Sequence, residues 1–347
     1  MKAGIVHAQK DIRYGDFPEP EIKSGCVKIR VRACGICGSD VPRVLGTEAH
    51  YYPIVLGHEF SGDVVEAGDG VKSLKPGDRV AGVPLIPCKT CPDCQNGDYA
   101  LCKNYSFIGS REQGAFAEYI VVPESNAVKI GDTVSYTMGA LFEPAAVALH
   151  GIFCAGFKDG ADTVILGTGN IGILAMQWAR IFGASRIAVV DILPERLELA
   201  KELGADVTFN PIDPNFSEQV KEFTNGRGFK YVFETAGQPA TIRLCFELAG
   251  NKASICCIGT PHKDFEFSWK QWELMNRKEF RLTGTWMSYS PPFPGNEWTL
   301  TAHYFGNGEL KLHDSMICKT MPLSEISEAF ELFKTPGKVK GKLIIEC

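Results

Sequence analysis

Four cysteines lie within a short stretch of the chain and could bind a metal. Cys88, Cys91, Cys94 and Cys102 are spaced C-x2-C-x2-C-x7-C and are interleaved with proline and glycine. Four thiolates so close in sequence can close a tetrahedral shell, which suits a structural Zn²⁺. An iron–sulfur cluster is a second interpretation, and free or disulfide-paired thiols are a third. A saturated shell leaves no position for a substrate, so we expect this site to hold a loop.

A second group of possible ligands is spread more widely. Cys37 lies in CGICGSD, and His58 and Glu59 lie in GHEFSG. A zinc peptidase helix would need a second histidine four residues after the first, but position 62 is glycine, so we do not expect a metalloprotease. A cysteine, a histidine and a more distant carboxylate can instead form a three-ligand catalytic zinc site with one open position.

The segment from Gly167 to Gly172 reads GTGNIG and matches G-x-G-x-x-G. An apolar strand is predicted before it and an apolar helix after it, and an acid, Asp191, follows 19 positions after Gly172. This arrangement is typical of a dinucleotide site, in which glycines admit the pyrophosphate to a helix N-terminus and the acid binds ribose hydroxyls. An acid there repels a 2′-phosphate, so we expect NAD rather than NADP. The alternative is a glycine-rich turn in another α/β fold. The expected cofactor-binding residues are Gly167, Gly169, Asn170, Ile171, Gly172, Asp191 and Arg196.

The elements that must position these residues change in type along the chain. Short β-rich runs separated by turns dominate the first part, as at 26–31, 62–67 and 116–123. From about 149 to 286 strands alternate with helices, which indicates βαβ units and a parallel sheet. The expected elements are strands 163–166, 186–190, 207–209, 231–234 and 253–258 and helices at about 171–182 and 194–203. The tail should hold helices near 296–307 and 324–334 and a strand at 342–345.

Length and composition limit the classes of function. The 347 residues suggest about two domains. The chain carries 36 Lys and Arg against 41 Asp and Glu, a net charge of −5, with no basic block, which argues against nucleic acid or a membrane surface as partner. Without a signal-peptide pattern at its start, we expect a cytoplasmic protein acting on a small molecule. The scattered Cys245, Cys256 and Cys257 are expected to be small buried hydrophobic residues.

Taken together, these motifs resemble those of the zinc-containing medium-chain alcohol and polyol dehydrogenases. The resemblance covers the whole chain, including the closing segment 336–345. It implies that the catalytic zinc is held by Cys37, His58 and Glu143, where some members have a cysteine in place of the last acid. It implies that Glu59 is a near-ligand that can swing onto the metal. It also implies that Ser39 contacts the substrate oxygen and begins a proton relay, a helix cap being the competing role.

Several tracts resemble the branch of this family that oxidises sugar-alcohol phosphates: HYYP at 50–53, FIGSR at 107–111, GTWMSYS at 284–290 and PGNEW at 294–298. A substrate phosphate needs cationic or N–H partners, for which Arg111 is the candidate, with an ordinary surface arginine as the alternative. Lys342 is a candidate for contact with substrate or cofactor phosphate. Tyr52, Trp286 and Tyr289 are expected to line the pocket, unless they serve as core or interface aromatics.

The resemblance also implies the architecture. We expect an α/β protein with a GroES-like β-rich catalytic domain at 1–148 and 287–347, and an inserted Rossmann domain with a doubly wound parallel sheet at 149–286. Two zinc ions per chain, one catalytic and one structural, NAD, and a homodimer or homotetramer are expected. Alternatives are a zinc dehydrogenase of free sorbitol, a diol or L-threonine, or a zinc- and NAD-binding protein without activity. The presence of Cys37, His58, Glu143 and Ser39 disfavours the last.

Overall fold

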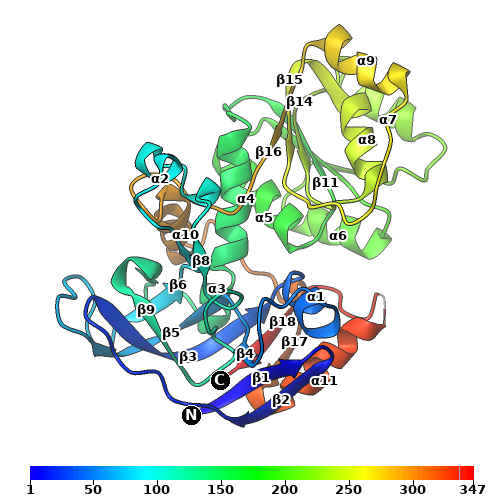
Figure 1. Ribbon diagram of the computed structural model, residues 1–347. Helices are drawn as coiled ribbons and strands as arrows, with labels where there is room; N and C mark the ends of the chain where they lie inside the picture. The colour runs from blue at the N-terminus through cyan, green and yellow to red at the C-terminus, as the bar shows by residue number, and fades with distance from the viewer. Residues whose placement is uncertain (336) are drawn as a thin grey trace. The chain divides into compact units, whose positions relative to one another are not determined.

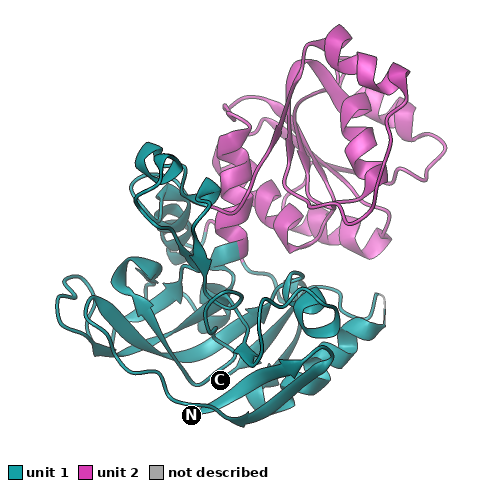
Figure 2. Cartoon of the chain, viewed as in Figure 1, with its two compact units in different colours: residues 1–143, 289–308, 312–347 teal, residues 144–288, 309–311 magenta. Residues whose placement is uncertain are grey.

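The computed structural model describes residues 1–335 and 337–347, so Pro336 of the predicted closing segment lies outside the described residues. The chain forms two compact units, which are coloured separately in Figure 2. Unit 1 contains residues 1–143, 289–308 and 312–347, and unit 2 contains 144–288 and 309–311. The boundary expected at 148/149 therefore falls inside helix α4 (Phe142–Cys154) rather than near its start. Among the described residues, no helix has the length and apolar character needed to cross a membrane.

Unit 1 is built mainly from antiparallel strands (Figure 1). Its largest sheet has the order β10-β6-β5-β3-β18-β17, with β9 also paired to β3, and only the β17–β18 pair is parallel. Two smaller sheets have the orders β2-β1-β4 and β7-β8. The strands are β1 (Lys2–Ala8), β2 (Asp11–Asp16), β3 (Cys26–Ile36), β4 (Ile54–Val55), β5 (Glu59–Ala67), β6 (Arg79–Gly82), β7 (Leu85–Ile86), β8 (Ser106–Phe107), β9 (Tyr119–Pro123), β10 (Ala127–Lys129), β17 (Ile317–Pro322) and β18 (Lys342–Glu346).

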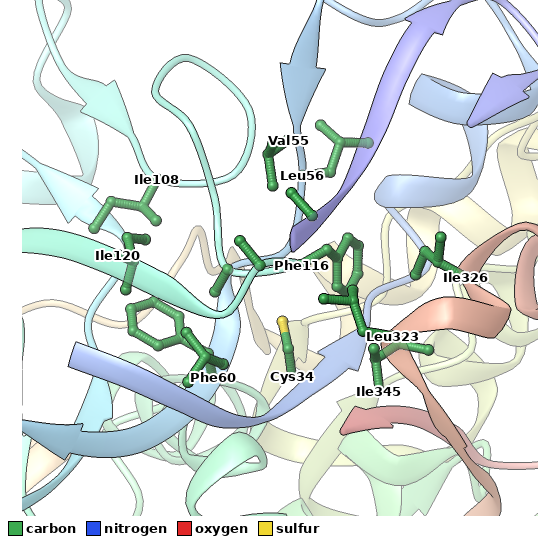
Figure 3. Close-up of a cluster of buried hydrophobic side chains, with 14 of the residues drawn as sticks. Cys34, Val55, Leu56, Phe60, Ile108, Phe116, Ile120, Leu323, Ile326 and Ile345 are labelled. Atoms are coloured by element: carbon green, nitrogen blue, oxygen red, sulfur yellow. The ribbon is translucent and has the colours of Figure 1, made fainter. Parts of the chain in front are cut away.

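The helices of unit 1 are short, as the scarcity of helical periodicity before about residue 137 indicates. They are α1 (Asp40–Leu45), α2 (Pro92–Asn96), α3 (Tyr136–Ala140), α10 (Asn296–Gly306) and α11 (Ile326–Glu331). Alternating apolar residues of the strands face a common core, part of which is drawn in Figure 3. There the Cys34 thiol lies among side chains such as Phe60, Phe116 and Ile345, and burial raises its pKa well above the usual value.

The register of three neighbouring strands of unit 1 determines where the ligand-type residues lie. Gly35 of β3 pairs with Glu59 of β5 on one side and with Ile344 of β18 on the other. The residue after β3 is Cys37, the residue before β5 is His58, and β18 begins at Lys342. Residues far apart in sequence therefore meet at one end of these three strands.

Unit 2 contains a six-stranded, wholly parallel sheet of order β13-β12-β11-β14-β15-β16. This is the Rossmann order, with the first strand in sequence at the centre and later strands added outward on both sides. The elements are β11 (Asp162–Leu166), α5 (Asn170–Ile181), β12 (Arg186–Val190), α6 (Pro194–Glu202), β13 (Val207–Phe209), α7 (Phe216–Phe223), β14 (Phe229–Glu234), α8 (Pro239–Leu248), β15 (Ala249–Cys257), α9 (Trp269–Lys278) and β16 (Arg281–Gly284). The predicted doubly wound parallel sheet is confirmed.

The scattered cysteines of unit 2 behave as the sequence suggests. Cys245 and Cys256 are fully buried, and Cys257 is partly buried at the end of β15. Burial raises the pKa of Cys257 to about 11 and raises that of Cys245 well above its usual value. Such thiols remain protonated and act as small apolar side chains.

Candidate active site and zinc centres

The four cysteines between β7 and β8 meet in one small lobe of unit 1. Cys91 precedes α2, Cys94 lies within α2, and the helix ends at Gly97, whose φ of 89° is the left-handed conformation that glycine adopts readily. The ligand atoms of Cys88, Cys91, Cys94 and Cys102 all lie within 4.8 Å of one another. The Cys88 and Cys94 sulfurs are 4.0 Å apart, close to the edge of about 3.8 Å that Zn–S bonds of about 2.3 Å give a tetrahedron.

The surroundings of these sulfurs favour thiolates. Hydrogen bonds from the Thr90 side chain and backbone and from the Cys91 N–H lower the pKa of Cys88 to about 6. The Cys88 N–H points at the Cys102 sulfur at 3.4 Å. Burial, by contrast, raises the pKa of Cys94 to about 12, so a bound cation is needed to ionise the whole set. Sulfurs this close can share one ion, so the lobe fits a single zinc.

A second donor group lies at the converging ends of β3 and β5. The ligand atoms of Cys37, His58 and Glu59 lie within 4.8 Å of one another. His58 is 3% exposed and Glu59 1%, and the buried His58 Nδ1 has no hydrogen-bond partner. A buried nitrogen without a partner costs free energy unless a ligand or ion satisfies it. This observation fits a zinc ion, and so does a donor set of one thiol, one imidazole and one carboxylate.

Asp40, at the start of α1, contacts two residues of this group. Its carboxylate is fully buried, accepts the Cys37 N–H at 2.9 Å and lies 3.5 Å from His58 Nδ1. Burial alone would lower the pKa of His58, but the charges of Asp40 and Cys37 raise it well above its usual value. The Asp40 carboxylate and the Cys37 sulfur thus favour a positive charge next to them.

Lys342 belongs to this site through Glu59. Its ammonium donates to Glu59 Oε1 and lies 2.7 Å from Oε2, and the lysine is 9% exposed. The Cβ of any residue larger than glycine at position 35 would lie 2.4 Å from Glu59 Oε2, so Gly35 leaves room for the pair. The ammonium is therefore engaged by the Glu59 carboxylate, and its expected contact with a substrate or cofactor phosphate stays a prediction.

Glu143, in the first turn of α4, takes a different position from Glu59. It is near enough for its charge to interact with His58 and Glu59, but it is not part of the group whose ligand atoms lie within 4.8 Å. Burial raises the pKa of Glu143 to about 7. The structure thus groups Glu59, expected as the near-ligand, with Cys37 and His58.

Ser39 stands at the first position before α1. Its hydroxyl makes no capping hydrogen bond, its N–H points at the Cys37 sulfur at 3.5 Å, and the residue is exposed. The helix-cap role is therefore not realised in the structure, and the hydroxyl is free to meet a substrate beside Cys37.

The glycine-rich loop of unit 2 joins β11 to α5. A Cβ at position 172 would lie 1.9 Å from the Gly167 carbonyl oxygen, so only glycine fits there. Gly167 has a φ of 94°, and Gly169 precedes α5 without a capping side chain. The first N–H groups of α5, from Asn170 and Ile171 onward, thus lack helical partners and suit a phosphate.

Asp191, directly after β12, lies beside this loop. Its Oδ2 accepts the Thr168 N–H at 2.8 Å and the Thr168 hydroxyl at 2.6 Å, and its Oδ1 accepts the Leu193 N–H at 3.0 Å. Arg196 donates to the Thr168 carbonyl at 2.9 Å. Asp191 and Arg196 therefore shape the loop itself, and the carboxylate keeps free lone pairs for a ribose.

The predicted substrate residues lie in different surroundings. Arg111 is exposed, stacks on the Tyr105 ring at 4.1 Å and donates to the Tyr105 carbonyl. Tyr52 is 40% exposed in unit 1 and Trp286 is 53% exposed in unit 2. Tyr289 is 3% exposed and its hydroxyl accepts the Leu85 N–H, which suits the core role expected as the alternative for it.

Three residues near the site were not singled out from the sequence: Asp40, Arg43 and His50. Asp40 supports Cys37, while Arg43 in α1 donates to the Ser39 carbonyl. His50 lies close enough to Arg43 and Arg111 for their charges to act on it. Asp40 could have been noticed in the CGSD tract next to Cys37, and His50 is the first residue of the HYYP tract, whereas Arg43 carries no signal of its own.

Comparison with known proteins places this geometry in a family. Residues 23–132 match the model of the alcohol dehydrogenase GroES-like domain, and residues 170–302 match that of the zinc-binding dehydrogenases. The chain is 40% identical to galactitol 1-phosphate 5-dehydrogenase of Escherichia coli (strain K12) over 90% of both chains. It is 34% identical to sorbitol dehydrogenase of Bacillus subtilis (strain 168) over 76% of both. The crystal structure of galactitol-1-phosphate dehydrogenase from Escherichia coli superimposes with a TM-score of 0.94 at 37% identity, covering 100% of each chain.

The chain belongs to the zinc-dependent medium-chain alcohol dehydrogenase family. It is an enzyme of the zinc-dependent alcohol and polyol dehydrogenase type, and the predicted GroES-like and Rossmann fold class is confirmed.

Proposed function

We propose that the enzyme oxidises the secondary hydroxyl at C5 of galactitol 1-phosphate to give tagatose 6-phosphate, with NAD as hydride acceptor. The observation that carries this proposal is the 40% identity to galactitol 1-phosphate 5-dehydrogenase along 90% of both chains. The balance is one hydride to NAD and one proton to solvent for each ketone formed.

The proposed catalytic zinc is held by Cys37 and His58 together with a carboxylate. Glu143 is the proposed third ligand, and Glu59 is a second acid within reach of the same position. The bound zinc would supply Lewis acidity, which lowers the pKa of a coordinated hydroxyl. The second zinc would be held by Cys88, Cys91, Cys94 and Cys102 and would stabilise their lobe.

The protein's own groups bind and orient the reactants. The free hydroxyl of Ser39 is placed beside Cys37 and exposed, so its Oγ can accept the substrate proton and pass it to water. Lys342 holds Glu59 in one orientation by its two short contacts. We also propose that the loop from Gly167 to Gly172 binds the cofactor pyrophosphate and that Asp191 binds the adenosine ribose.

A free polyol is the second candidate substrate. The 34% identity to sorbitol dehydrogenase supports it over a shorter share of the chain than the first relative covers. A homodimer or homotetramer stays a prediction, which light scattering of the purified chain tests.

The dehydrogenase proposal is tested by metal removal and return. The full chain is assayed for NADH formation with galactitol 1-phosphate, stripped with a chelator and reloaded with Zn²⁺. We expect activity to fall with zinc content and to return when the zinc of the Cys37 site returns. Full activity in metal-free protein would contradict the proposed catalytic zinc.

A further inference from the structure

A buried acid, Glu234, ends strand β14 of unit 2 and is fully enclosed by the protein. Its carboxylate accepts the backbone N–H of Ala236 at 3.0 Å, the N–H of Gly237 at 2.9 Å and the Thr241 hydroxyl at 2.6 Å. These donors lie in the turn between β14 and α8 and in the first turn of α8. The carboxylate therefore fixes the shape of this turn.

Thr235, the next residue, joins the turn to the glycine-rich loop. Its backbone N–H donates to the Leu166 carbonyl oxygen at 2.9 Å. Its hydroxyl donates to the same oxygen at 2.9 Å and to the Gly167 carbonyl oxygen at 3.0 Å. Leu166 is the last residue of β11, and Gly167 is the first glycine of the loop. The hydroxyl is thus bonded to the point at which the loop begins.

The turn and the loop also pack too closely to admit a methyl group between them. A Cβ at position 172 would lie 2.8 Å from the Thr235 hydroxyl oxygen, and a Cβ at position 167 would lie 2.9 Å from the Ala236 Cβ. Gly172 stands in the first turn of α5. The 235–237 turn therefore forms one wall of the loop, and a shift of the turn would displace the loop.

Glu234 contacts a third connection of the sheet as well. Its carbonyl oxygen accepts the N–H of Ile258 at 2.8 Å and of Gly259 at 3.0 Å, directly after β15. A Cβ at position 259 would lie 2.7 Å from Glu234 Oε2. The carboxyl ends of β11, β14 and β15 are thus linked at one edge of the parallel sheet. This is the edge at which doubly wound sheets bind their ligands.

Such anchoring matters for a loop that binds a phosphate. Backbone N–H groups bind it best when they already point at it, because ordering a free loop costs conformational entropy. Asp191 holds the loop at Thr168 from the side of β12. Thr235 holds it one residue earlier from the side of β14, so the loop is fixed on both sides before a ligand arrives.

We propose that Glu234 and Thr235 are positioning residues for the cofactor. Glu234 shapes the 235–237 turn, and Thr235 holds the loop from Gly167 to Gly172 in the conformation that binds the pyrophosphate. This inference rests on the proposed function, because it names the residues that support the proposed cofactor site.

Thr235→Val tests the proposal, since it removes the hydroxyl and keeps the branched side chain. Calorimetry of the full chain measures binding of NAD and of ADP-ribose, which carries the pyrophosphate without the nicotinamide. Both Kd values should rise about tenfold, as loss of one hydrogen bond predicts, and KM for NAD should rise equally with little change in kcat. Thr235→Ser keeps the hydroxyl and should recover most of the affinity. Glu234→Gln turns an amide N–H₂ toward backbone donors and should also weaken both ligands.

Thr224→Val is the matched control. Thr224 is 2% exposed, follows α7 and donates its hydroxyl to the Val220 carbonyl oxygen at 2.8 Å. The control removes a hydroxyl that donates to a carbonyl oxygen in the same unit. Urea unfolding should therefore show a loss of stability in both valine variants, whereas only Thr235→Val should bind NAD more weakly.

Three results would count against the proposal. A Thr235→Val variant that loses no more affinity for NAD than Thr224→Val would overturn it and leave the proposed function standing. Weaker binding of NAD with unchanged binding of ADP-ribose would also overturn it, because the effect would then lie at the nicotinamide. A wild type that binds neither ligand would remove the proposed cofactor, and the positioning role with it.

Discussion

The ammonium of Lys342 lies 2.7 Å from both carboxylate oxygens of Glu59, and both side chains are buried. The pair joins the first residue of β18 to the first residue of β5, next to His58. Although burial alone would lower the Lys342 pKa, the Glu59 charge raises it above its usual value. Lys342 thus stays charged and holds the Glu59 side chain next to the proposed zinc.

Removal of one partner of this pair should be costly. Lys342→Met leaves the Glu59 carboxylate buried without its counter-charge, and we expect unit 1 to lose about 3 kcal/mol of stability. Glu59→Gln combined with Lys342→Met should recover part of that loss, since no unpaired charge is then buried. Urea unfolding of the zinc-loaded single and double variants measures the coupling. Strict additivity of the two single effects would contradict the pairing.

Substitutions in the two proposed zinc sites should have different effects on activity and stability. Cys37→Ser should lower the zinc content from two to one per chain and abolish turnover, while NAD binding measured by fluorescence is retained. Cys91→Ser should also remove one zinc but act mainly on stability, with increased proteolysis in the lobe of α2. Metal analysis and activity are measured on the same samples. Retained turnover in Cys37→Ser would refute the catalytic assignment.

Asp191 should set the choice of cofactor. Asp191→Asn keeps hydrogen-bonding capacity toward Thr168 but removes the negative charge, so NAD should bind several-fold more weakly and NADP relatively better. The ratio of kcat/KM for the two cofactors measures the change, with exposed Glu198→Gln on α6 as control. An unchanged ratio would mean that Asp191 only shapes the loop.

Glu124 provides a pH-dependent contribution to stability. Its Oε1 accepts N–H groups of Lys72, Ser73 and Leu74 and the Ser73 hydroxyl, and the Ser73 bonds chiefly lower its pKa to about 2. A carboxyl group whose pKa is lower in the folded than in the unfolded state stabilises the folded protein at pH values above the unfolded pKa. For Glu124 this contribution is lost as the pH falls toward about 2.

Glu124→Gln should therefore be about 1 kcal/mol less stable than the wild type at pH 7, after allowance for solvent screening. The difference should shrink as the pH falls below 4.5, the ordinary pKa of a glutamate side chain. Thermal unfolding of both proteins at several pH values tests this. A difference that stays constant down to pH 4 and below would show that the carboxylate charge is not responsible.

The site was predictable where its ligands are local in sequence. Cys88, Cys91 and Cys94 lie on one short loop and helix, so spacing alone predicts their meeting. The glycine loop was predictable for the same reason, because β11, the turn and α5 follow one another. The strand at 186–190 was found with its bounds because it is a continuous apolar run, whereas the first residues of β15, Ala249–Lys252, include glycine and polar residues and were missed.

The rest depends on pairings between distant segments. Lys342 and Glu59 are 283 positions apart, and only the register of β18, β3 and β5 brings them together. Whether Glu143 comes as near to Cys37 and His58 as Glu59 does depends on where the first turn of helix α4 lies in unit 1.

The most direct measurement of the central claim is NADH formation by the zinc-loaded wild type with galactitol 1-phosphate, galactitol and sorbitol side by side. The account predicts a kcat/KM for galactitol 1-phosphate at least about a hundredfold above that for either free polyol, because a free polyol lacks the charge-assisted hydrogen bonds that a phosphate makes. Equal or better use of galactitol or sorbitol would contradict it and assign the same zinc chemistry to a free polyol.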